Sequence, residues 1–274
     1  MRVVLHLKIQ SRKACGGYLR PMNAKRRGMA LTLTMAVTFL SMMDVWGQTE
    51  TRGSQPEVQF FGALKDMMMH SDISSKARLA DHSGSAGMWG LGAVAGLQGE
   101  VFIEDGTPWV SRSDAGNPDA VVVAQETEAE ATLLVAARVT GWTPTKLPRK
   151  VNTQAELEDF LLKAAREAGF DVDAPFPFRL TGTFSEVQWH VVNWKEGDME
   201  HTCEKHKTTG PHGVLAALQG EILGFHSLHH HRIFTHHSTN VHMHVKSASG
   251  DLVAHVDGLT LGKGTTLWLP GNGE

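Results

Sequence analysis

The sequence predicts an α+β fold with mixed, mostly antiparallel β-sheets and a few helices. Helical periodicity is confined to two segments in the first two thirds of the chain, and apolar runs bounded by turn residues dominate its second half. Near the C-terminus, histidines alternate along one strand and recur across a tight turn. This third observation predicts a metal site on a C-terminal β-hairpin.

The first helix is predicted over 60–68, where phenylalanine, leucine and methionine recur at helical spacing. Its three consecutive methionines are expected to fill the core and not to form a metal-binding box. The second helix is predicted to begin at the capping box Thr153–Glu156 and to stop before Gly169. Both helices precede most of the strands.

The strands follow from short apolar runs between turn residues. Residues 90–96 are too glycine-rich for a helix and lack the basic residue of a phosphate-binding loop. The alanines of 131–139 leave a helix open there as an alternative to a strand. The predicted strands are 97–103, 108–111, 120–125, 131–139, 178–184, 187–192, 221–226, 241–245, 252–256 and 266–269.

The predicted metal site consists of His242, His244 and His255. Two histidines two residues apart leave the same face of a strand. A two-residue Ser249-Gly250 turn pairs 246 with 253 and 244 with 255, so the third imidazole lies opposite the second, with Cβ atoms about 4.5–5.5 Å apart. Three imidazoles with an open fourth position are typical of catalytic zinc or another divalent ion.

The remaining histidines have a less specific interpretation. Thirteen of the 16 histidines lie between His190 and His255, and such a stretch can also scavenge metal or lie solvated on loops. The acidic and histidine-rich segment 196–206 is expected to be a solvated loop between strands. The alternative is that its glutamates contribute to the site.

The N-terminal segment 1–47 is predicted to be a leader that contains a secretory signal peptide, with Met22 as a candidate start. Three basic residues precede the apolar run 29–43, and small residues at Val45 and Gly47 place a cleavage site before Gln48. An uncleaved anchor is the alternative. We expect an exported protein, periplasmic or secreted, with no stable membrane insertion after cleavage and a flexible start at 48–56.

Composition limits the classes of partner. The net charge is −3, the pI is about 6.6, and no basic stripe is visible, which argues against nucleic acid. Cys15 precedes the predicted cleavage site, so Cys203 remains alone and no internal disulfide is expected. The chain after residue 47 is long enough to bury one substantial core.

Three segments resemble the α-acetolactate decarboxylase family, whose members convert 2-acetolactate to acetoin and carbon dioxide. The matching segments are GLGAVAGLQGEVFIEDGTPWV at 90–110, LQGEILGF at 218–225 and NVHMHVKSASGDLVAHVDGL at 240–259. The resemblance implies one domain over 57–270 and a carboxy-lyase of acetoin biosynthesis. It also implies that His242, His244 and His255 bind the metal, and that Glu100 is the acidic residue beside it.

The chain departs from the family at two points. The family has a catalytic arginine on or after the strand that corresponds to 187–194, where this sequence has none. Arg232, Lys195 or a protonated His190 are the candidates to replace it, and only Arg232 offers the same bidentate geometry. The family also has a glutamate in a C-terminal tail, where this chain ends at Glu274.

The chemistry agrees with the resemblance. Decarboxylation of a 2-hydroxy-3-keto acid leaves an enediolate, whose negative charge a divalent ion stabilises as a Lewis acid. Glu100 is expected to deliver the proton if burial raises its pKa. The expected partner is therefore a small 2-hydroxy-3-keto acid, and a homodimer is left open. The alternative function is an exported, non-catalytic metal-binding or small-acid-binding protein that kept the three histidines.

Overall fold

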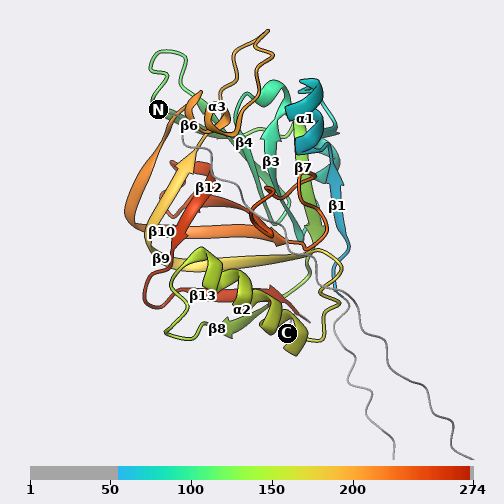
Figure 1. Cartoon of the computed structure of the whole chain (residues 1–274), viewed down its shortest axis with the longest axis vertical. Helices are drawn as coiled ribbons and strands as arrows, with labels where there is room; N and C mark the ends of the chain where they lie inside the picture. The colour runs from blue at the N-terminus through green and yellow to red at the C-terminus, as the bar shows by residue number, and fades with distance from the viewer. Residues whose placement is uncertain (1–54, 272–274) are drawn as a thin grey trace, which may run out of the picture. The chain divides into compact units, whose positions relative to one another are not determined.

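The computed structural model describes residues 55–271, which form two antiparallel β-sheets and three short α-helices (Figure 1). The predicted fold class is confirmed. The predicted leader 1–47 and the residue Glu274 lie outside the described residues. Within 55–271, no helix combines the length and the apolar character that a membrane crossing requires.

The first sheet has the strand order β1-β7-β3-β4-β5-β6, with β2 paired to β7. Strand β7, which lies between β1 and β3, is buried at seven consecutive residues. This is the pattern of a strand covered on both faces and excludes the helix left open for this segment. The strands are β1 (Val58–Phe61), β2 (Ala77–Arg78), β3 (Met88–Val94), β4 (Glu100–Glu104), β5 (Thr107–Ser113), β6 (Val121–Gln125) and β7 (Glu130–Arg138).

The strands predicted at 97–103 and 108–111 are present as β4 and β5, which form a hairpin. Glu104 pairs with Thr107, and the two residues between them, Asp105 and Gly106, have φ values of 46° and 80°. Positive φ at both central positions is characteristic of the tight turns that match the twist of a hairpin. The turn thereby fixes the register of β4 against β5. Glu100 lies at the end of β4 that is farther from the turn, where it pairs with Ser111.

The second sheet has the strand order β10-β11-β12-β9-β13-β8, and β10 also pairs with β9. The four strands β9, β10, β11 and β12 therefore pair in a closed circuit. Two predicted strands, 178–184 and 187–192, belong to the single long strand β9. The strands are β8 (Trp142–Lys146), β9 (Phe176–His190), β10 (His212–His226), β11 (Val241–Ser247), β12 (Val253–Thr260) and β13 (Thr266–Pro270).

The predicted register of the C-terminal hairpin is confirmed, because Lys246 pairs with Val253 and His244 with His255. The turn is longer than the two residues expected. Ser247 donates its N–H to the carbonyl of Leu252, and 248–251 form the loop. Four loop residues retain the register of a two-residue turn, since two residues are added symmetrically.

The helices are α1 (Leu64–His70), α2 (Gln154–Glu167) and α3 (Cys203–Thr208), with two short 3₁₀ helices, η1 (Leu79–His82) and η2 (Ala95–Leu97). The capping box that starts α2 is present: Thr153 accepts from the N–H of Glu156, whose carboxylate accepts from the N–H of Thr153.

The predicted first helix is wrong at its start. Phe60 and Phe61 lie in β1, paired to β7, and the helix begins only after Gly62.

The apolar core of residues 55–271 consists of three clusters, of which the smallest lies on the first sheet. One of the two larger clusters joins Leu91 and Phe102 of the first sheet to Leu223 and Phe225 of the second, and it includes Met67 of α1. The other packs α2 against the second sheet. Of the three methionines, Met67 is buried as expected, whereas Met69 is 71% exposed.

Candidate metal centre

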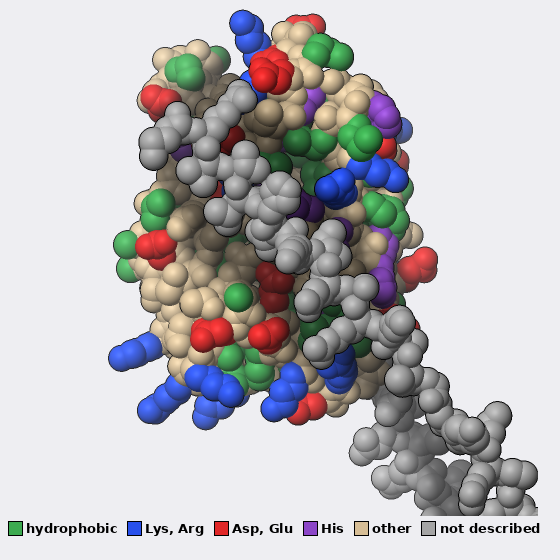
Figure 2. Space-filling view, in the orientation of Figure 1, with side chains coloured by type: hydrophobic (Ala, Val, Ile, Leu, Met, Phe, Trp, Pro, Cys, Tyr) green, Lys and Arg blue, Asp and Glu red, His purple; other side chains and the backbone are tan. Residues whose placement is uncertain are grey.

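A cavity of about 850 Å³ reaches from the surface to the strands that carry the predicted ligands. Residues of α1, β3, β4, β9, α3, β12 and the loop before β11 line it. Its walls include Glu100, His190, His242, His255 and Asp257. Figure 2 shows histidine side chains mostly along one side of the face in view, some of them set back below the surface.

Strand register gathers the histidines. His244 of β11 lies directly opposite His255 of β12, and His255 lies directly opposite His190 of β9. Directly opposite residues share a face of the sheet. His242, two residues before His244, lies on that face as well. Four imidazoles from three neighbouring strands therefore point to one side.

The spacing of three of these rings suits a metal ion. The ring centres of His242, His244 and His255 are 5.0, 5.2 and 5.5 Å apart. A tetrahedral ion that accepts a nitrogen at about 2.1 Å from each ring places the ring centres roughly 5 Å apart. The ring centres of the predicted ligand set thus have separations compatible with zinc, and metal binding itself stays a prediction.

The free ring nitrogens support this fit. Among the described residues, Nδ1 of His242 and Nε2 of His244 are buried without a hydrogen-bond partner. Nδ1 of His244 donates to the carbonyl of Val101 at 2.9 Å, which leaves Nε2 with its lone pair. Burial lowers the pKa of both imidazoles well below the ordinary value. Neutral, unpartnered imidazole nitrogens are metal donors, and without an ion they are costly to bury.

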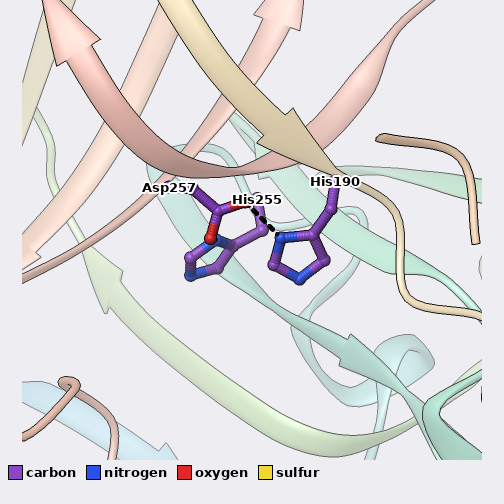
Figure 3. A group of neighbouring side chains, drawn as sticks. All are labelled: His190, His255 and Asp257. Carbon is purple, nitrogen blue, oxygen red and sulfur yellow. Dashed lines mark hydrogen bonds and ion pairs between the residues drawn. The ribbon is translucent and has the colours of Figure 1, made fainter. Parts of the chain in front are cut away.

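Asp257 lies behind two of the rings (Figure 3). Nδ1 of His190 donates to its Oδ2 at 2.7 Å, and Nδ1 of His255 is 3.5 Å from its Oδ1. Donor atoms of these three residues lie within 4.8 Å of one another, so they form a second candidate metal group. Burial lowers the pKa of His190 to about 4, against the opposing effect of Asp257, so the ring is neutral near neutral pH.

Glu100 is only 3% exposed and lies beside this cluster. Its Oε1 accepts from the N–H of Val192 at 3.1 Å and is 3.9 Å from Nε2 of His190, while its Oε2 is 3.6 Å from Nε2 of His244. Burial raises the pKa of Glu100 well above its ordinary value, although the bond from Val192 opposes this. A raised pKa favours the protonated form of the carboxyl group, which can donate a proton.

Backbone geometry explains why Glu100 turns inward. Gly99 has a φ of 128°, and a Cβ atom there would lie 2.0 Å from the carbonyl oxygen of Ser111. Only glycine permits this close approach of β5. The glycine before the glutamate thus aims the first side chain of β4 at the histidines, and not at solvent.

The candidate cations lie at different places. Arg232 is exposed and lines the cavity, with a φ of 63°, whereas Lys195 is exposed and does not line it. Lys207, which sequence reasoning missed, lines the cavity and places Nζ 3.1 Å from Oδ1 of Asp257. His190, the third candidate, lies in the histidine cluster.

The segment 196–206 differs in part from the solvated loop that was expected. Glu196, Glu200 and Glu204 are exposed, as expected. Its other residues are ordered by contacts: Lys205 pairs with Asp198, and the segment ends in α3. Short helices of this kind escape sequence reasoning because tertiary contacts, and not periodicity, stabilise them.

A protein-family model described as alpha-acetolactate decarboxylase matches residues 60–268. The chain belongs to the alpha-acetolactate decarboxylase family. The resemblance that the sequence suggested is therefore confirmed. Among curated protein sequences, none matches this chain.

Solved structures of alpha-acetolactate decarboxylases have a similar fold. The enzyme from Bacillus subtilis strain 168 is 15% identical, with a TM-score of 0.61 over 78% of this chain and 84% of that chain. The enzyme from Bacillus subtilis subspecies spizizenii is 17% identical, with a TM-score of 0.62 over 78% and 85%. A Staphylococcus aureus protein of unknown function, described as similar to alpha-acetolactate decarboxylase, is 13% identical, with a TM-score of 0.59 over 77% and 84%.

Within this alpha-acetolactate decarboxylase fold, the strand on which the resemblance places a catalytic arginine ends at His190. Sequence reasoning proposed His242, His244, His255 and Glu100, which the structure brings together, and it did not consider Asp257. The only available signal for Asp257 was its position two residues after His255, which places both side chains near one another on β12.

Proposed function

We propose that this protein decarboxylates 2-acetolactate to acetoin and carbon dioxide with the help of a divalent metal ion. The observation that supports this most directly is the buried carboxyl of Glu100, which lies 3.6 Å from the free nitrogen of His244 inside a cavity. A structural metal site has no need of a protonated acid beside it. A decarboxylase needs one, because the carbon that loses carbon dioxide must gain a proton.

His242, His244 and His255 would hold the ion, which zinc fits by donor type and spacing. When bound, a divalent ion supplies Lewis-acid stabilisation of the negative charge that develops on the substrate oxygens. In the reaction the bond between the carboxylate and the neighbouring carbon breaks, and its electron pair remains on the substrate as an enediolate. Glu100 then transfers its proton to that carbon.

The substrate carboxylate requires a cation at the cavity wall. Arg232 and Lys207 both line the cavity, and either side chain can donate charge-assisted hydrogen bonds to a carboxylate. Apolar side chains such as Leu97, Val192 and Phe234 also line the cavity. Apolar walls exclude water and strengthen the electrostatic contacts that orient the substrate.

The test is the release of acetoin from racemic 2-acetolactate by the purified, zinc-loaded protein, with elemental analysis of bound metal. We expect about one divalent ion per chain and acetoin formation well above the blank, with both lost in His244→Ala, because each ligand closes the same site. Full metal content without acetoin would favour the non-catalytic binding protein. Equal metal content in His244→Ala and the wild type would remove the three histidines from the proposal.

A further inference from the structure

We infer that His190 is a fourth imidazole ligand of the metal centre, and that Asp257 is the positioning carboxylate that holds His190 and lies beside His255. This inference rests on the metal site of the proposed function and extends it beyond the three histidines of the hairpin. It assigns a role to the strand on which the family resemblance placed an arginine.

His190 lies next to His255, one of the three predicted ligands, and on the same face of the sheet. His190 is the last residue of β9 and pairs directly with His255 of β12. His255 in turn pairs directly with His244 of β11. The ring centre of His190 is 4.7 Å from that of His255, close to the 5.0–5.5 Å that separate the other rings. The imidazole is buried and belongs to the same face of the sheet.

The hydrogen bond to Asp257 fixes which nitrogen of His190 is available. Nδ1 donates to Oδ2 of Asp257 at 2.7 Å, so Nε2 carries the lone pair. Figure 3 shows that Nε2 is turned away from that carboxylate, and it lies 3.9 Å from Oε1 of Glu100. Glu100 also approaches the free Nε2 of His244, so both lone pairs face the same carboxyl group.

Asp257 binds one ring and lies beside a second. Its second oxygen is 3.5 Å from Nδ1 of His255 without a hydrogen bond between them, and Lys207 supplies a positive partner to that oxygen at 3.1 Å. Metal-binding histidines characteristically donate their outer N–H to a carboxylate or a backbone carbonyl, which fixes the ring orientation. His190 has the carboxylate and His244 has the carbonyl of Val101, so both have the arrangement of ligands.

The alternative is that Asp257 is itself a ligand, beside Nδ1 of His190. Two ligand atoms on a tetrahedral ion at about 2.1 Å lie roughly 3.4 Å apart. The observed separation of 2.7 Å is that of a charge-assisted hydrogen bond. The carboxylate therefore binds the ring and not a shared ion, and the ion belongs on the opposite side of the rings.

Four imidazoles make a different centre from the open three-ligand site that the sequence predicted. A substrate that binds through two oxygens would raise the coordination number to six. Ions that accept octahedral geometry and nitrogen ligands, such as iron, cobalt or nickel, then become suitable alongside zinc. The identity of the bound ion is thus linked to the presence of His190.

The decisive measurement is X-ray absorption spectroscopy of the zinc-loaded full chain, which counts imidazoles around the metal. We expect four in the wild type and three in His190→Gln. We also expect Asp257→Asn to weaken zinc binding by about 10- to 100-fold in chelator competition, the usual effect of removing a ligand's supporting partner. His212→Gln is the matched control, because His212 is exposed and is the other cross-strand neighbour of His190; it should change neither quantity.

Three imidazoles in the wild type would overturn the inference, and this count does not depend on any variant folding. An unchanged zinc affinity in Asp257→Asn would overturn the role of Asp257. Failure of the proposed function has a different signature, namely zinc-loaded protein that releases no acetoin. If instead the wild type has three imidazoles and His244→Ala has lost its zinc, the hairpin site stands and only His190 is excluded.

Discussion

Glu100 combines burial with two imidazole neighbours, and its proposed role as proton donor can be tested. Glutamine has nearly the same shape and cannot give up a proton. We therefore expect Glu100→Gln to keep the fold and the bound metal while it lowers acetoin formation by about 10²-fold or more. Thermal unfolding and elemental analysis of the same preparation check the fold and the metal.

The matched control for this change is Glu104→Gln. Glu104 ends the same strand but pairs with Lys246 at 2.6 Å, away from the cavity. Its replacement should leave turnover unchanged. Wild-type turnover in Glu100→Gln would exclude Glu100 from proton transfer.

His226 is a second buried side chain with a measurable pH effect. It is fully buried, stacks on Phe176 at 4.8 Å, and among the described residues neither ring nitrogen has a partner. Burial lowers its pKa to about 4. Between pH 6.5 and 4 the unfolded chain therefore binds a proton at His226 that the folded chain does not. The contribution of His226 to the free energy of unfolding is present at neutral pH and is lost as the pH falls.

We expect proton uptake by His226 in the unfolded chain to lower the free energy of unfolding by about 2 kcal/mol between pH 7 and pH 5. His226→Leu lacks the proton uptake, so the stability of the variant relative to the wild type should rise as the pH falls. Urea unfolding at several pH values measures this difference. A difference that stays constant with pH would show that His226 titrates alike in both states.

At the scale of the elements, Arg179 connects the two sheets. It lies on β9, pairs with Glu221 of β10, and places its guanidinium 4.2 Å from the ring of Trp89 and 5.1 Å from that of Trp142. Both charged side chains are largely buried, so removal of the arginine leaves a buried carboxylate without a partner. We expect Arg179→Ala to lower the free energy of unfolding by about 3–5 kcal/mol.

Two further variants separate the charge from the packing. Lys163→Ala breaks an exposed ion pair with Glu167 on α2 and should cost less than about 0.5 kcal/mol. Arg179→Met combined with Glu221→Leu removes both buried charges and should recover most of the lost stability. A double variant as unstable as Arg179→Ala would mean that the aromatic contacts, and not the ion pair, dominate.

At the scale of the whole molecule, we propose that the protein is exported and that its leader is removed. We expect the mature chain to begin near Gln48, because Val45 and Gly47 are the small residues that signal peptidase requires. Mass spectrometry of the exported protein gives the terminus directly. Gly47→Leu should block cleavage, whereas Gln48→Ala, one residue later, should not. A full-length chain in the cytoplasm would refute export.

The parts of the fold that the sequence predicts are those with local signals. The β11–β12 register follows from alternating histidines and a turn only a few residues away, and the start of α2 follows from its capping box. The helical spacing of Phe60 and Phe61 is misleading because a partner strand, β7, is available only in the folded chain. Pairing across a sheet overrides local periodicity there.

The residues of the candidate site likewise fall into those with a local sequence signal and those placed by long-range strand pairing. His242, His244 and His255 are close in sequence, so a hairpin argument reaches all three. The place of His190 depends on the pairing of β9 with β12, whose residues are separated by 65 positions at His190 and His255. No local pattern specifies that register, and Asp257 acquires a role only through it.

The closed circuit of β9, β10, β11 and β12 bears on how a metal would enter. His190, His244 and His255 each have a cross-strand partner on both sides, so the backbone of these three residues does not lie at a free edge. Their amide protons should then exchange with solvent only through global opening. An ion can enter a set of rings already in place, in contrast to sites that fold around their metal. We expect hydrogen exchange of these amides to be nearly the same with and without chelator.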